Sequence, residues 1–142
     1  MPVSTGIATA VVFVWAGMVL AISFIEAPLK FRAPGVTVQI GLGIGRLVFR
    51  ALNTAEVVLA LALASAALIE HPPREVVITG AVALSTFVVQ LAVLRPRLKR
   101  HADLVLAGAD APRSHTHYLY VGFELVKLSA LLATGTALLV SQ

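Results

Sequence analysis

The chain alternates four long apolar runs with short polar connections. The runs cover residues 3–25, 44–69, 76–94 and 117–140, and each is close to the roughly 20 residues that a helix needs to cross the apolar core of a bilayer. The pattern therefore predicts an all-α fold, an integral membrane four-helix bundle. No stretch is left for a separate soluble domain, so we expect a single transmembrane domain over residues 1–142.

The connections contain residues that end or bend helices. Pro28 follows the first run closely, and a proline inside a helix removes a hydrogen bond and crowds the preceding turn. We therefore expect the first helix to stop or kink there. The longest polar connection runs from Arg95 to Arg113, and Ser114 is a suitable N-cap for the last helix.

The composition agrees with a membrane location. Of 142 residues, 58% are hydrophobic and 13% charged, and the mean hydropathy is +0.93, whereas about a quarter of the residues of a soluble domain are charged. The absence of cysteine excludes disulfides and thiolate chemistry. No surface that combines aromatic and basic residues is apparent, so we expect no nucleic-acid partner. The lipid bilayer is the expected partner, and a homo-oligomer is an open alternative.

Basic residues lie mainly on one side of the predicted bundle. Of the 11 lysines and arginines, nine fall in or beside the first and third connections, one is Arg74 in the second connection, and one is Lys127 within the last run. The positive-inside rule then places both termini on the extracytoplasmic side of the cytoplasmic (inner) membrane, N-out and C-out. The third connection also carries a basic cluster that we expect to contact anionic lipid headgroups. The cluster consists of Arg95, Arg97, Lys99 and Arg100.

Polar side chains interrupt the cytoplasmic half of all four predicted helices. Charges that face hydrocarbon are costly, so such groups usually face a partner or a cavity. The predicted polar layer consists of Glu26, Arg46, Arg50, Asn53, Glu56, Gln90, His117, Tyr120, Glu124 and Lys127. Depths calculated from the helical rise suggest that Arg50 faces Glu124, and that Asn53 or Glu56 faces Lys127. If Glu56 and Lys127 pair, exchanging the two residues should preserve the fold.

Three functions fit this layer. It can line a cytoplasm-facing pocket that binds or transports a small amphipathic ligand, which is the function we favour. It can instead be a closed salt-bridge clamp between helices, or an enzyme site, although no catalytic residue or cofactor is indicated. His115 and His117 lie at a helix start, where interfacial residues are common, so no metal is expected; a site that adds Glu26 is the alternative.

The chain resembles a four-helix membrane family of unknown function. The likeness rests on Trp15-x-Gly17, on Phe24-x-x-Ala27-Pro28-Leu29-x-Phe31-Arg32, on Gly45-x-Leu47-Val48 and on Leu94-Arg95-Pro96-Arg97. This family includes the eukaryotic transmembrane protein linked to cisplatin resistance. The resemblance implies a four-helix membrane fold and no established chemistry.

A second, shorter likeness is to the microsomal glutathione transferases. It rests on Arg50-Ala51-x-Asn53-x-x-Glu56, and it implies that these residues, with Arg46, hold the carboxylates and amine of glutathione. In that family the arginine precedes the asparagine by four positions. Here Arg50 precedes Asn53 by three, which rotates the arginine by about 100° around the helix.

Overall fold

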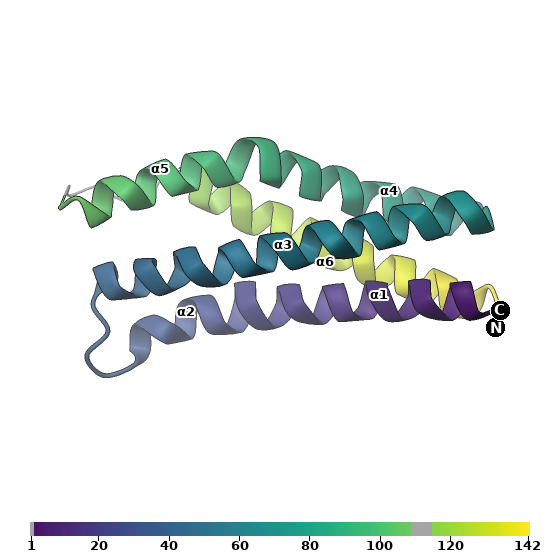
Figure 1. The fold of residues 1–142 in the computed structure, drawn as a ribbon, viewed down its shortest axis with the longest axis horizontal. Helices are drawn as coiled ribbons and strands as arrows, with labels where there is room; N and C mark the ends of the chain where they lie inside the picture. The colour runs from purple at the N-terminus through teal and green to yellow at the C-terminus, as the bar shows by residue number, and fades with distance from the viewer. Residues whose placement is uncertain (1, 109–114) are drawn as a thin grey trace.

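The structure, a computed structural model, describes residues 2–108 and 115–142. These residues form helices joined by short connections, and they include no strand. The helices make up four long rods, residues 3–32, 38–70, 74–106 and 115–140. They form one bundle, with both chain ends at the same end (Figure 1). The second and fourth rods run in the same direction, and the other two run the opposite way.

Two of the four rods change helix type along their length. The first rod consists of α1 (Val3–Val19), the π-helical segment η1 (Leu20–Glu26), α2 (Ala27–Leu29) and the 3-10 turn η2 (Lys30–Arg32). The third consists of α4 (Arg74–Val89), the π-helical segment η3 (Gln90–Leu94) and α5 (Arg95–Leu106). The second and fourth are the single helices α3 (Val38–Glu70) and α6 (His115–Val140).

All four rods are long and apolar enough to cross a membrane. This confirms the predicted all-α class, and each predicted run lies within one rod. The rods extend further than predicted, however, because the third continues from Arg95 to Leu106, where we had expected the polar connection to begin. The predicted N-cap Ser114 lies outside the described residues.

Proline explains where the two π-helical segments occur. Pro28 and Pro96 each follow a π-helical segment by two residues. Neither proline can donate a hydrogen bond to the carbonyl four residues earlier, which belongs to Phe24 in η1 and to Ala92 in η3. The wider π turn accommodates the lost hydrogen bond and the proline ring, so the helix continues with a local change in its turn.

The apolar core is formed by side chains of α1, α3, α4 and α6, and α3 contributes Leu63. Trp15, Val19 and Leu131 are fully buried in it, and the rings of Trp15 and Phe87 meet edge to face, with centroids 5.6 Å apart. Many large apolar side chains remain exposed on the outer faces of the rods, for example Leu61. In a bilayer such side chains contact lipid, so the exposed apolar surface agrees with the membrane assignment.

Candidate functional site

Three charged side chains meet inside the bundle. The ammonium group of Lys127 on α6 lies 2.8 Å from Glu56 Oε2 on α3 and 2.6 Å from Glu124 Oε1 on α6. The exposed fractions of Glu56, Glu124 and Lys127 are 0%, 1% and 0%. One ammonium group is therefore shared by two carboxylates inside the protein. We call these three residues the inner triad.

The two π-helical segments supply hydrogen bonds to one carboxylate of the inner triad. Ser23 Oγ in η1 donates to Glu124 Oε2 over 2.5 Å, and Gln90 Nε2 in η3 donates to Glu124 Oε1 over 2.7 Å. Together with Lys127, the Glu124 carboxylate thus has donors from three rods. Both side-chain donors thus lie in the π-helical segments that precede Pro28 and Pro96.

Arg95 lies at the edge of the inner triad. Its Nη2 group donates to the Tyr120 hydroxyl over 3.0 Å and lies 3.4 Å from Glu56 Oε1. Its Nη1 group lies 3.5 Å from the Phe49 carbonyl oxygen. The Arg95 Nε group is buried and has no hydrogen-bond partner. The arginine side chain is 12% exposed, so it lies between the closed interior and the surroundings.

A second cation, Lys30, lies close to this edge. Its ammonium group is 3.9 Å from Glu26 Oε2 and about as far from the rings of Phe31 and Phe49 as a cation–π contact allows, at 5.5 and 5.8 Å. It lies over Gly45, where a Cβ atom would approach Lys30 Nζ to 2.8 Å. The glycine therefore makes room for the lysine against α3.

The structure confirms one predicted pair and corrects another. Glu56 and Lys127 pair as expected. Arg50 does not face Glu124: it is exposed, and Glu124 binds other residues. Arg50 and Glu56 are six residues apart, which places them about 120° apart around α3, so both cannot face the interior.

The remaining predicted residues are more dispersed. Arg46 is exposed and pairs with Asp103 of α5 at 2.9 Å, whereas Asn53 is half-buried, with its side-chain oxygen buried and unpaired. Tyr120 is buried and joins the network through Arg95. His117 is half-buried, with its ring edge-on to Tyr118.

No group of three potential metal ligands among His, Cys, Asp and Glu occurs within residues 2–108 and 115–142. His115, which the sequence analysis considered with His117 as a metal ligand, is exposed at the start of α6.

Sequence reasoning missed two contributions to the network. Ser23 was not singled out, and Arg95 was expected only at lipid headgroups, whereas it turns toward Glu56 and Tyr120. Arg97, Lys99 and Arg100 of the same cluster are exposed on α5. The sequence feature that separates Arg95 from the rest of the basic cluster is its position directly after the apolar run 76–94 and directly before Pro96.

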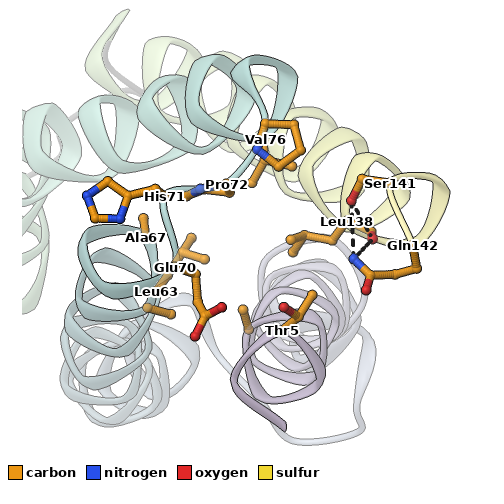
Figure 2. A pocket seen from close by; sticks show the side chains of 13 residues that line it. Thr5, Leu63, Ala67, Glu70, His71, Pro72, Val76, Leu138, Ser141 and Gln142 are labelled. Atoms are coloured by element: carbon orange, nitrogen blue, oxygen red, sulfur yellow. Dashed lines mark hydrogen bonds between the residues drawn. The ribbon is translucent and has the colours of Figure 1, made fainter. Parts of the chain in front are cut away.

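The described residues also line a cavity at the other end of the bundle, beside the chain ends. Its volume is about 140 Å³, and its walls include Ala8, Leu63, Val76 and Leu138. Figure 2 shows side chains of all four rods around it. Glu70 at its rim accepts a hydrogen bond from Ser4. None of the predicted ligand-binding residues lines this cavity.

Comparison of the chain with protein-family models, curated proteins and solved structures found no match. The two resemblances noted from the sequence therefore stay predictions. Of the residues that the glutathione-transferase likeness implies, Arg50 is exposed and Glu56 is fully buried against Lys127.

Proposed function

We propose that this chain is an integral membrane protein that binds the acidic head of a small amphipathic molecule at Arg95. The observation that carries the proposal is the Arg95 Nε group, which is buried without a hydrogen-bond partner. A buried donor without a partner costs about 1–3 kcal/mol, and such a group in a folded protein calls for an explanation. An acidic ligand that accepts a hydrogen bond from Nε supplies one.

The guanidinium edge formed by Nε and Nη2 suits a carboxylate, sulfonate or phosphate. Arginine binds such groups through two parallel hydrogen bonds. On this edge Nε is free. Nη2 donates to the Tyr120 hydroxyl over 3.0 Å, and its second contact, with Glu56, is 3.4 Å, longer than the usual 2.7–3.2 Å range. A ligand oxygen can therefore replace a weak contact. The side chain is 12% exposed, so the arginine is not fully enclosed by the bundle.

The surroundings favour an acidic head. Lys30 adds a second cation near Phe49, and no hydrogen bond to its ammonium group occurs among the described residues. The segments η2 and α5, which carry Lys30, Arg32, Arg95, Arg97, Lys99 and Arg100, lie at the end of the bundle opposite the chain termini (Figure 1). By the positive-inside rule this end is cytoplasmic, so the site would open toward the inner leaflet.

A structural role is the second candidate, and it is supported by the closure of the inner triad. The exposed fractions of 0–1% leave Glu56, Glu124 and Lys127 without access for a ligand. We assign these residues to helix packing and to positioning of Arg95. If the whole network is such a clamp, no amphipathic acid should bind.

The test measures binding to the purified protein in nanodiscs of phosphatidylcholine. Decanesulfonate is the acidic probe, with decanol and decyltrimethylammonium as neutral and cationic controls of equal chain length. We expect decanesulfonate to raise the melting temperature by mass action, and both controls to have little effect. Arg95→Gln should weaken decanesulfonate binding about tenfold or more, because charge-assisted hydrogen bonds contribute about 1.5–3 kcal/mol.

Arg97→Gln is the matched control, since Arg97 is exposed on the same helix. It should change the affinity less than twofold. Equal losses in the two variants, or equal stabilisation by decanol, would contradict the proposal. Nanodiscs that contain phosphatidylglycerol distinguish a lipid from a free ligand, because a bound lipid headgroup would compete with the probe. Stabilisation by glutathione in place of decanesulfonate would instead support the enzyme alternative.

A further inference from the structure

We infer that binding of an acidic head at Arg95 is coupled to the uptake of one proton by Glu56. The inference rests on the proposed function and follows from the charges in the network. Glu56 and Glu124 carry two negative charges, and Lys127 and Arg95 carry two positive charges, so the network is neutral. Without Arg95, the inner triad has one excess negative charge inside the bundle.

Arg95 and Lys127 are the two cations for which a contact with Glu56 is found in the part of the chain that the structure describes. Lys127 and Glu124 are already paired on α6, which also presents the Tyr120 hydroxyl. The π-helical segments η1 and η3 contribute only the neutral Ser23 and Gln90. The remaining charges nearby are held elsewhere, because Arg46 pairs with Asp103, and Lys30 lies beside Glu26.

An acidic ligand competes directly with Glu56 for the same edge of Arg95. When a ligand oxygen takes Nη2, Glu56 Oε1 loses its contact with the guanidinium group and keeps only the ammonium group that it shares with Glu124. Two carboxylates then depend on one ammonium group where water is excluded, which is unfavourable. A proton on Oε1 restores neutrality.

The buried surroundings contain a hydrogen-bond acceptor for the protonated Glu56 carboxyl group. The side-chain oxygen of Asn53 is buried and unpaired, and Asn53 lies three residues before Glu56, on the neighbouring turn of α3. The step balances: one anion and one proton enter, Arg95 moves from Glu56 to the anion, and the network stays neutral. The site would thus bind an acid together with its proton, which is the requirement of electroneutral symport.

The test is calorimetry of decanesulfonate binding in Bis-Tris and in Tris, two cationic buffers that differ in their heats of protonation and do not compete for Arg95. Decanesulfonate carries a fixed charge, so any proton taken up must enter the protein. We expect about one proton per ligand bound in the wild type. The affinity should then weaken about tenfold for each unit of pH increase over the range in which Glu56 is ionised before binding.

Two variants separate the possible results. Glu56→Gln removes the proton acceptor and should bind decanesulfonate with no proton uptake and with a flat pH profile. Glu70→Gln, which alters a carboxylate at the opposite end of the bundle, should retain the wild-type proton count. Normal binding by the wild type with no proton uptake would overturn the inference and leave the proposed function standing. Absence of binding would overturn the proposed function itself, and the wild-type result needs no variant to fold.

Discussion

Replacement of Lys127 by methionine should reveal how strongly the inner triad is held. The substitution keeps the length and apolar stem of the side chain but removes the ammonium group that contacts Glu56 at 2.8 Å and Glu124 at 2.6 Å. Two carboxylates then lie in the interior with no shared cation. Removal of one partner from a buried ion pair costs about 3–5 kcal/mol, which would lower the ratio of folded to unfolded protein at least a hundredfold.

The unfolding of this variant can be followed through Trp15. It is the only tryptophan in the chain and is fully buried against Phe87. Denaturation in mixed micelles should show the loss for Lys127→Met, while Arg46→Met, which breaks the exposed pair with Asp103, should lose about 1 kcal/mol or less. The triple variant Glu56→Gln, Glu124→Gln, Lys127→Met should recover most of the loss, because it leaves no unpaired charge. A loss below about 1 kcal/mol for Lys127→Met, or a triple variant no more stable than the single one, would refute this reasoning.

Two further predictions follow from the packing. Gly135→Ala should destabilise the protein by about 1–3 kcal/mol, because its Cβ atom would lie 2.5 Å from the Phe13 ring. Gly122→Ala, with open space around it, should be neutral or slightly stabilising in the same denaturation assay. Exchange of Glu56 and Lys127 should now destabilise the fold, because the new lysine would face Arg95 and the new glutamate would adjoin Glu124. Wild-type melting of the exchanged protein would contradict the observed network.

The four-helix architecture could be predicted because it depends on simple apolar runs. Each run needs only enough apolar residues to cross a bilayer, and every predicted run lies within one observed rod. The ends of the rods could not be predicted in the same way. Proline usually ends a helix, but the π-helical turns before Pro28 and Pro96 let both helices continue.

Depth along the helix was enough to predict the pair of Glu56 and Lys127. The angular position around the helix determines which of the other predicted residues face the interior. The helical rise places residues of two parallel helices at comparable heights, and it identified this pair correctly. It does not show which residues face inward. Arg50 was expected in the interior with Glu56, but about 120° separates them on α3, and the buried Leu52 and Glu56 fix the inward face.

An ion pair that is present in the structure does not have to tolerate the exchange of its two residues. The sequence suggested that Glu56 and Lys127 could trade places, since a pair considered alone is unchanged by exchange. In the structure Glu56 also faces Arg95, and Lys127 also faces Glu124. Arg95 reaches Glu56 because the helix continues through Pro96; in the loop that we expected, it would have been free to meet lipid. The contact of Arg95 with Glu56 and that of Lys127 with Glu124 therefore make the network directional, and Arg95, which balances the excess negative charge of the closed triad, keeps an unpaired donor at its edge.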